Sequence, residues 1–556
     1  MRSRRGPWVV FVFVFAFLAW KLVEYHCFPD PRVYAQSQRQ YWSRTPIIGN
    51  RGYIQDSKGN ILALSTSVSS FFVDPKRWSP SSASSLIGLL PQNIIQKISG
   101  PLEGRYVRIL RKSAPELGQK IIDLNLEGLY EEKEKKREYP NNALLSHVLG
   151  YCDFDENGQA GVELAWDSTL YEPPGHRILI RQTGGRSIAI GDERDYEKEP
   201  EISSVTLTID LRIQYVIEKY LDETMKLHNA KWGAVLCMDP KTGAILSMAS
   251  WPTFNPNNRE EFSHPEKTLN NAVGRAYEPG STFKPIFMGI AIEDGLVRTN
   301  ETFQCQARLK VADGVITEAY KRAMGTLSTS QILIKSSNVG MAQIGIRSKP
   351  LDMYRSLLNW GFGKVGDIEL KGVEKGLILS PGQWRGVVPA NISIGQGLAV
   401  TPLQLITAMA AVVNGGEYVS PYIVQEARNS SGEIVYQGRK NMIRELLTPE
   451  TCSWLRKTMR DTVIEGTGRQ ADTPFTELAV KTGTAQVAEK GKYVPGRYVA
   501  SIVGFWPYEN PKYLTLIVVG EPRNGKYYGG EVAGPALKKI VEGMADLESF
   551  DNGKKL

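Results

Sequence analysis

The N-terminal segment constrains this chain more than any other, because it carries an apolar run that a water-soluble fold can hardly cover. Three of the first five residues are arginines, and thirteen residues without a polar side chain follow, from Trp8 to Trp20. With Lys21 to Tyr25 the segment approaches the ~20 residues of a bilayer-spanning helix, since long side chains near a helix end can reach the interface. Arginines before such a helix favour a cytoplasmic N-terminus. We therefore predict that residues 1–28 are a cytoplasmic tip and a transmembrane anchor helix.

A cleaved signal peptide is the competing interpretation of this segment. Its cleavage site would be Val33-Tyr-Ala35, which matches the small-residue pattern poorly and lies late after the apolar core. An uncleaved anchor is therefore favoured. Everything after about Phe28 is then expected outside the cytoplasm, in a single-pass protein of the cell (inner) membrane.

Composition excludes several classes of function. The chain has 556 residues, which suggests two or three folded units. Its net charge of +8 is not concentrated in any stretch, so no nucleic-acid partner is predicted. The five cysteines lie too far apart for a metal site or a disulfide framework, although a single disulfide stays open outside the cytoplasm. No metal and no cofactor is predicted.

The pattern of polar and apolar residues changes near Pro200. Before it, the chain is polar, with short strand-like runs broken by Gly, Pro and Asn, and the charge run 131–138 predicts a solvated helix or loop face. After it, residues 206–210 indicate a strand, and Asp210 can cap a helix with an apolar stripe. A new domain therefore begins there.

The C-terminal half alternates strands with helices. A hairpin is predicted at residues 233–250, with Asp239-Pro-Lys-Thr-Gly243 as its turn. Thr401 as N-cap, Pro402 at the first helical position and Gly415 as the stop predict a helix. Later apolar strands are predicted at 478–480, 498–505 and 513–519. The unit is therefore α/β or α+β, with a mainly antiparallel sheet flanked by helices.

Three short motifs in this half point to acyl-transfer chemistry: Ser281-Thr-Phe-Lys284, Ser336-Ser-Asn338 and Lys481-Thr-Gly-Thr484. On a helix, positions i and i+3 share a face, so Lys284 can come within reach of Ser281. A serine hydroxyl needs a base beside it, and a lysine can be that base when burial and positive neighbours keep it neutral. No histidine follows His264, which disfavours a histidine base.

Each motif alone is weak, but their order is specific. Ser-x-x-Lys, Ser-x-Asn and Lys-Thr-Gly in this succession are typical of penicillin-recognising serine enzymes. In the first half, three further motifs resemble those of class B penicillin-binding proteins: Arg51-Gly-Tyr-Ile-Gln-Asp56, Arg137-x-Tyr139-Pro140 and Gly158-x-x-Gly161-x-Glu163. The resemblance runs from about residue 46 to 535. Arg51 and Glu163 are interpreted as structural.

The resemblance implies an extended, mainly-β non-catalytic pedestal (dimerisation-type) domain at 29–200, a β-lactamase-like transpeptidase domain at 201–548 and a tail at 549–556. Trp251-Pro-Thr-Phe-Asn-Pro256, Gly395-Gln-Gly397 and Tyr527-Tyr-Gly-Gly530 look most like the cell-division group or its sporulation relative. The elongation-specific group is the near alternative. The implied activity is that of a D-Ala-D-Ala transpeptidase acting on peptidoglycan stem peptides.

The resemblance also implies a role for each motif. Lys284 would take the proton from Ser281, Ser336 would relay a proton to the leaving amine, and Asn338 would hold the donor amide. Lys481 with Thr482, Gly483 and Thr484 would bind the terminal carboxylate.

Partners follow from the same resemblance. β-Lactams would acylate Ser281, and a glycan polymerase of the SEDS family and other division proteins would be partners. A β-lactamase is disfavoured because no general base for water can be assigned. A non-catalytic β-lactam sensor or scaffold is disfavoured because all three motifs are intact.

Overall fold

The computed structural model describes residues 6–27, 42–47, 50–104, 106–172, 175–181, 187–189, 202–489 and 492–551. Two compact units divide the chain. The N-terminal unit comprises residues 1–50, 68–135 and 172–201, and the C-terminal unit comprises 51–67, 136–171 and 202–556. The alternative cleavage site at Val33-Tyr-Ala35 lies outside the described residues.

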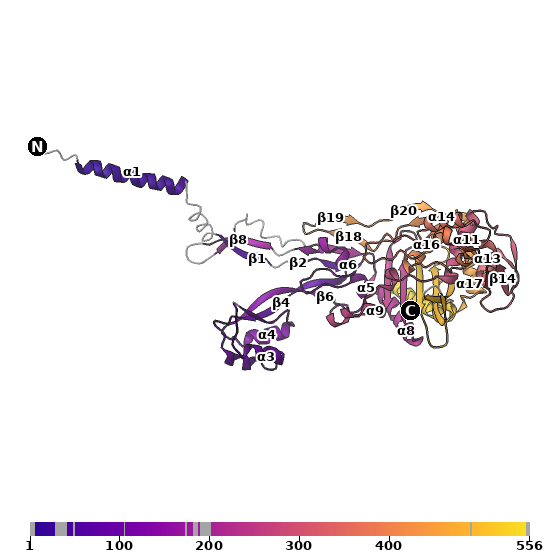
Figure 1. Ribbon diagram of the computed structural model, residues 1–556, viewed down its shortest axis with the longest axis horizontal. Coiled ribbons are helices and arrows are strands. Elements are labelled where there is room, and N and C mark those ends of the chain that lie inside the picture. Colours follow the sequence, from indigo (N-terminus) through magenta and orange to yellow (C-terminus); the bar gives the residue numbers. More distant parts are fainter. Residues whose placement is uncertain are drawn as a thin grey trace. The chain divides into compact units, whose positions relative to one another are not determined.

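The N-terminal unit contains the apolar helix expected from the sequence. Helix α1 spans Gly6–Cys27 and is drawn in indigo in Figure 1. The window from Trp8 to Tyr25 is not buried against any described part of the chain. By length and composition, α1 is able to cross a membrane.

The same unit holds a small folded module with its own core. Strand β5 (Val107–Leu110) pairs antiparallel with the end of β4 (Ile61–Val73). The packed elements are η1 (Pro80–Leu86), α3 (Gln92–Ile98) and α4 (Pro115–Asp123). The core of the module includes Phe71 of β4, Trp78, Leu86, Ile98 and Ile121. Separately, β8 (Gly175–Arg181) pairs antiparallel with β1 (Trp42–Ile47) and β9 (Ser187–Ala189).

The charge run at 131–138 is a strand, so the expectation of a helix or loop was wrong. It belongs to β6 (Leu129–Glu138), which pairs with β4. One charge of the run, Glu134, accepts a 2.6 Å hydrogen bond from Ser70 of β4 and forms a 2.8 Å ion pair with Arg111, which follows β5. Cross-strand partners of opposite charge stabilise a sheet, and a reading along the sequence does not reveal them.

The C-terminal unit is built on an antiparallel sheet, as predicted. Its described strands run in the order β12-β11-β23-β22-β21. Their bounds are β11 (Trp232–Met238), β12 (Ile245–Trp251), β21 (Ala479–Glu489), β22 (Lys492–Trp506) and β23 (Tyr513–Gly520). The predicted hairpin at 233–250 is therefore the β11–β12 pair.

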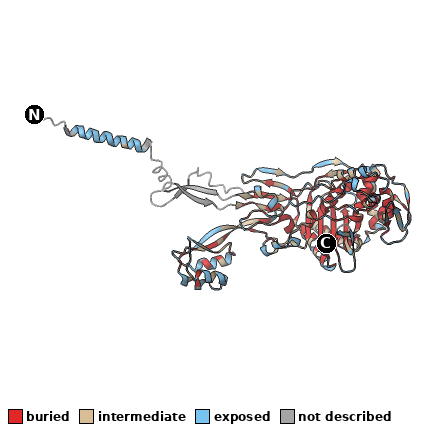
Figure 2. Cartoon of the chain, in the orientation of Figure 1, coloured by how far each residue is buried: buried red, intermediate tan, exposed pale blue. Residues whose placement is uncertain are grey.

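Helices cover both faces of this sheet, because successive strand residues point to opposite sides. Val235 and Cys237 of β11 belong to the same cluster as α8 (Leu211–Leu227) and α19 (Gly534–Asp551). Ala234 and Leu236 belong to the cluster of α11 (Lys284–Glu293) and α16 (Pro402–Asn414), against which α17 (Pro449–Ile464) packs. Figure 2 shows the buried residues concentrated around this sheet.

The predicted helix caps are present. The Asp210 side chain accepts from the backbone N–H of Arg212 and caps α8. Thr401 forms a capping box with Gln404 at the start of α16, and Gly415 ends that helix with a left-handed φ of 104°. These contacts satisfy backbone groups that a helix end leaves unpaired.

Smaller elements complete the C-terminal unit. A second sheet has the described order β19-β18-β10-β3, continued by β4. Its strands are β3 (Tyr53–Gln55), β10 (Ser204–Leu207), β18 (Val424–Arg428) and β19 (Ile434–Gln437). Two hairpins matter for the site: β13 (Thr302–Cys305) with β16 (Gly325–Ser328), and β14 (Arg308–Val311) with β15 (Gly314–Thr317). Helices α12 (Thr329–Ile334), α13 (Asn338–Gly345) and α14 (Pro350–Asn359) follow them.

A buried charge cluster lies in the C-terminal unit at the motifs interpreted as structural. Arg51 and Arg137 each donate from Nε to Glu163, at 2.7 Å to its two carboxylate oxygens. Glu163, in α6 (Gly161–Ala165), is fully buried. Burial favours a raised pKa for Glu163, but Arg137 and Arg51 outweigh it and hold the pKa below its usual value.

Candidate active site

Ser281 lies on a tight turn that leads directly into a buried helix. Residues Gly280–Phe283 form the 3-10 helix η4, and Lys284 is the first residue of α11, followed by Pro285. Gly280 has a φ of 55°, a conformation that glycine adopts without strain. In a 3-10 helix side chains at i and i+3 eclipse each other, so Ser281 and Lys284 share one side of the turn.

Strand β21 brings the Lys481 motif against this turn through a very close approach at Gly483. A Cβ atom at Gly483 would lie 2.6 Å from Ser501 Oγ and 2.9 Å from Thr282 Cγ2. Only a glycine fits that gap. The glycine of the Lys-Thr-Gly motif therefore sets the distance between the edge strand and the Ser281 turn.

The Ser336 motif forms the opposite wall. Ser336 has a left-handed φ of 57°, which is uncommon for a non-glycine residue and marks a conformation held by its surroundings. Ser337 follows as the N-cap of α13, accepting a 2.9 Å hydrogen bond from the N–H of Gly340. The turn between α12 and α13 thereby aims Ser336 and Asn338 at the cavity.

Two buried lysines converge on Ser336. Lys284 Nζ lies 2.8 Å from the backbone oxygen of Ser336, 2.8 Å from Asn338 Oδ1 and 3.4 Å from Ser336 Oγ. Lys481 Nζ lies 2.9 Å from the same Ser336 Oγ. Both lysine side chains are fully buried. The Ser336 hydroxyl thus lies between the side-chain nitrogens of the two lysines.

Ser281 is not hydrogen-bonded to Lys284 within the described part of the chain, so the expected direct contact is absent in this state. Ser281 is partly exposed and lines the cavity, whereas Lys284 lies beneath the surface with its donors directed to the Ser336 turn. The structure therefore joins four of the predicted residues directly and places Ser281 on the same cavity.

Burial disfavours the charged form of both lysines, Lys284 and Lys481, and so lowers their pKa values. It lowers the pKa of Lys284 to about 7, against an upward pull from the carboxylate of Glu318. Burial and the positive charge of Lys284 lower the pKa of Lys481 as well. A lysine with a pKa near neutrality can accept a proton, which an exposed lysine cannot do at physiological pH.

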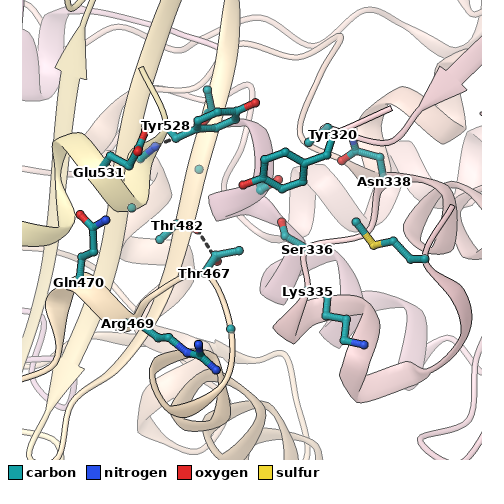
Figure 3. A pocket seen from close by; sticks show the side chains of 18 residues that line it. Tyr320, Lys335, Ser336, Asn338, Thr467, Arg469, Gln470, Thr482, Tyr528 and Glu531 are labelled. Atoms are coloured by element: carbon teal, nitrogen blue, oxygen red, sulfur yellow. Dashed lines mark hydrogen bonds between the residues drawn. The ribbon is translucent and has the colours of Figure 1, made fainter. Parts of the chain in front are cut away.

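The cavity has a volume of about 480 Å³, and its lining includes Ser281, Ser336, Asn338, Thr482, Gly483 and Thr484. Figure 3 shows Ser336 and Asn338 on the wall opposite Thr467 and Thr482, whose hydroxyls lie 2.6 Å apart. Tyr320 and Tyr528 meet across the mouth with ring centroids 5.5 Å apart.

Comparison with known families assigns both halves of the chain. Residues 233–542 match the family described as the penicillin binding protein transpeptidase domain, and residues 46–200 match the penicillin-binding protein dimerisation domain. The chain is a class B penicillin-binding protein. It carries an N-terminal apolar helix, a dimerisation domain and a transpeptidase domain with an antiparallel sheet flanked by helices.

Named relatives cover nearly the whole chain. The probable peptidoglycan D,D-transpeptidase PenA of Neisseria gonorrhoeae is 30% identical over 91% of this chain and 86% of its own length. The peptidoglycan D,D-transpeptidase FtsI of Escherichia coli K12 is 28% identical over 89% of this chain and 83% of its own length. A peptidoglycan synthetase structure from Bifidobacterium adolescentis shares the fold, with a TM-score of 0.72 and 23% identity over 91% of this chain and 97% of that chain.

Glu318, which follows β15, is buried beside this cavity and was not among the residues predicted from the sequence. Its carboxylate accepts from the Ser337 hydroxyl at 2.5 Å, from the Asn338 N–H at 2.8 Å and from the Val339 N–H at 3.2 Å. It thereby caps α13 and fixes the turn that carries Ser336. A lone glutamate eighteen positions before Ser336 carries no motif, so no pattern in the sequence marks it.

Proposed function

We propose that this chain is a peptidoglycan D,D-transpeptidase that cross-links stem peptides through an acyl-enzyme on Ser281 during septal wall synthesis. The observation that carries the proposal is the pair of buried lysines on Ser336, beside a cavity that exposes Ser281. The printed names of the PenA and FtsI relatives agree with this activity.

In the first step, neutral Lys284 takes the proton of Ser281, whose Oγ attacks the carbonyl between the two terminal D-alanines. This needs a small movement of the neutral Lys284 amine away from the Ser336 turn. The backbone N–H groups of Ser281 and Thr484 stabilise the developing oxyanion. Asn338 holds the donor amide.

In the second step the C–N bond breaks and a proton reaches the departing amine of D-alanine. Ser336 relays that proton, because its hydroxyl lies within hydrogen-bond distance of Lys481 and near Lys284. Lys481, Thr482, Gly483 and Thr484 bind the terminal carboxylate before it leaves. An amine of a neighbouring stem then attacks the ester carbonyl, forms the new amide and releases Ser281.

Release of D-alanine from a pentapeptide donor tests the activity. The full chain in detergent should release D-alanine and form a penicillin adduct that mass spectrometry locates on Ser281, while Ser281→Ala should do neither. Rapid turnover of penicillin would indicate a β-lactamase instead. A stable fold with neither reaction would indicate a sensor or scaffold.

The septal role rests on resemblance to the division group, and the elongation and sporulation roles are the alternatives. Depletion in the source organism separates them, because loss of a septal enzyme gives filaments and loss of an elongation enzyme gives rounded cells.

We also propose a SEDS-family polymerase as the partner that supplies glycan strands. Residues 29–200 would serve as the pedestal and 201–548 as the transpeptidase domain.

Helix α1 is proposed as a retained anchor with a cytoplasmic N-terminus. N-terminal sequencing of protein extracted from membranes should therefore recover residues before Trp8. The control is protease treatment of intact spheroplasts, which should degrade the body and spare the tip. A mature chain that begins near Gln36 would contradict the anchor.

Glu318→Gln should slow acylation of Ser281 and shift its pH dependence. The amide group cannot accept from every donor of the Ser337 turn, and we expect a loss of about 10- to 100-fold, on the order of 1.4–2.7 kcal/mol of barrier. The carboxylate of Glu318 raises the pKa of Lys284. Its removal should lower that pKa, so the rising limb of rate against pH should move to lower pH.

Second-order acylation constants with a fluorescent penicillin between pH 5 and 9 measure both effects. Glu301→Gln is the matched control, because Glu301 is a partly exposed carboxylate that accepts from a backbone N–H and pairs with Arg347, and it does not line the cavity. If Glu318→Gln slows acylation but leaves the rising limb of rate against pH where it is in the wild type, Glu318 acts on the structure of the turn and not on the pKa of Lys284.

A further inference from the structure

A second cavity continues the catalytic one along the same strand. It has a volume of about 680 Å³ and is lined by residues 486–489 of β21, whereas Thr482, Gly483 and Thr484 of that strand line the catalytic cavity. Glu278 lies in the second cavity, three positions before Ser281. The two cavities therefore follow one another along β21, and the Ser281 turn lies close to both of them.

The direction of a donor peptide follows from this arrangement. Among the described strands, β21 is at the edge of its sheet, and an extended peptide can pair with such an edge. With its terminal carboxylate at Lys481–Thr484, the peptide runs antiparallel to β21 and its upstream residues lie toward 486–489. Each residue advances about 3.3 Å, so the residue before the reacting alanine reaches the second cavity.

Arg275 is a cation in this cavity without an ion-pair partner among the described residues. Its Nε donates to Asn271 at 2.6 Å, and its guanidinium lies 4.9 Å from the ring centroid of Trp232. Burial lowers the pKa of Arg275. A half-buried guanidinium with free terminal donors suits a carboxylate, which it can bind through two parallel hydrogen bonds.

Glu278 is the complementary group. Its carboxylate accepts from the Gly397 N–H at 3.0 Å and from the Tyr493 hydroxyl at 3.1 Å, and no cation of the described chain pairs with it. Burial raises the pKa of Glu278. An ammonium group beside it would restore the ordinary preference for the ionised form.

The other charges of the cavity are largely satisfied. Arg497 lies 2.6 Å from Glu521 and 2.5 Å from Glu489, and Lys231 lies 3.6 Å from Glu521. Lys492 is an exposed residue at the rim. Arg275 and Glu278 are therefore the two charges inside the cavity without a direct ion pair among the described residues, although Arg275 also feels the carboxylate of Glu521, which is already shared with Arg497 and Lys231.

A third group in the wall also lacks a partner. The hydroxyl of Tyr277 is buried and has no hydrogen-bond partner in the described structure, although buried hydroxyls are normally bonded. Tyr277 is 6% exposed and lies between Arg275 and Glu278 in sequence. A polar ligand end in this cavity would give that hydroxyl an acceptor.

We propose that the second cavity is the subsite for the donor-peptide side chain just upstream of the reacting alanine, and that it selects a side chain ending in both an ammonium and a carboxylate group. Arg275 binds the carboxylate and Glu278 binds the ammonium. The inference rests on the proposed transpeptidase function and adds to it the class of donor.

Peptide thioester donors test the subsite, because the released thiol reports turnover directly. Four donors differ only at the end of that side chain, which carries ammonium and carboxylate, ammonium alone, carboxylate alone, or neither. The wild-type full chain in detergent should favour the doubly charged donor over the neutral one by at least about tenfold in kcat/KM. Ratios between donors cancel any general loss at Ser281.

Single variants then assign each charge. Arg275→Gln should bring the ratio of the doubly charged donor to the ammonium-only donor close to 1, and Arg275→Lys should restore part of it. Glu278→Gln should bring the ratio of the doubly charged donor to the carboxylate-only donor close to 1. Lys539→Gln, which removes an exposed cation paired with Glu223 outside both cavities, should leave both ratios unchanged.

Equal kcat/KM for all four donors in the wild type would overturn the subsite and leave the transpeptidase function standing. Variants that slow every donor by the same factor would also overturn it, because the two charges would then support the fold or the Ser281 turn. Failure to turn over any donor, together with failure to form a penicillin adduct, would overturn the proposed function and the subsite with it.

Discussion

Lys284→Arg should abolish acylation of Ser281 although it preserves a positive charge. Burial lowers the pKa of Lys284 to about 7, so a large fraction of the lysine is neutral at physiological pH and can accept a proton. An arginine has a pKa above ~12 and stays charged even when buried. The loss should approach that of Ser281→Ala, on the order of 10³-fold or more, because residues that act as one unit fail together.

The acylation rate of the wild type should accordingly rise as the pH passes through about 7, where Lys284 loses its proton. Stopped-flow measurement with a fluorescent penicillin, after a thermal-melting check of each variant, gives the rate constants. The double variant with Ser281→Ala should be no slower than either single variant. A Lys284→Arg enzyme within about tenfold of wild type, or ~1.4 kcal/mol, would show that the Ser281 proton goes elsewhere.

Local signals in the sequence predicted most of the C-terminal fold correctly. The Asp210 and Thr401 caps begin helices, and Gly415 ends one, because each satisfies backbone groups within a few residues. The hairpin at 233–250 is likewise a neighbour interaction. Such features depend on residues that are close together in the sequence, so the order of residue types is enough to predict them.

The site was predictable in its residue types but not in its contacts. The three motifs do meet, yet Lys284 bonds to the Ser336 turn rather than to Ser281. That preference depends on the left-handed backbone of Ser336 and on Glu318, which holds the turn from eighteen residues upstream. Neither the φ angle nor the long-range carboxylate follows from motif spacing.

The prediction of a helix or loop at 131–138 was wrong for a related reason. Equal numbers of acidic and basic residues suggest a solvated helix or loop, and residues 131–133 are indeed exposed, but the run forms strand β6 and Glu134 pairs with Arg111 beyond the run. Arg137 at its end is buried and paired with Glu163. A sequence shows that charges are present, and only the three-dimensional pairing shows which of them enter the interior.

That buried pairing makes Glu163→Ala the most destabilising substitution we expect away from the catalytic cavity. The variant leaves the guanidinium groups of Arg51 and Arg137 buried with their main counter-ion gone. Removal of one partner from a buried ion cluster costs about 3–5 kcal/mol of unfolding free energy. Glu163→Gln should cost less, because its amide oxygen can still accept a hydrogen bond.

The expected pH dependence follows from the direction of the shift. The folded-state pKa of Glu163 is below its unfolded value, so its contribution is complete above the unfolded pKa and is lost as the pH falls through the folded pKa. Urea unfolding of wild type and variants from pH 7 down to acid should therefore show the difference shrinking only at low pH. Glu132→Ala, which removes an exposed pair with Arg108, is the control and should change stability by less than about 1 kcal/mol. A Glu163→Ala protein as stable as this control, or one that keeps its stability and loses acylation, would contradict a structural role for the cluster.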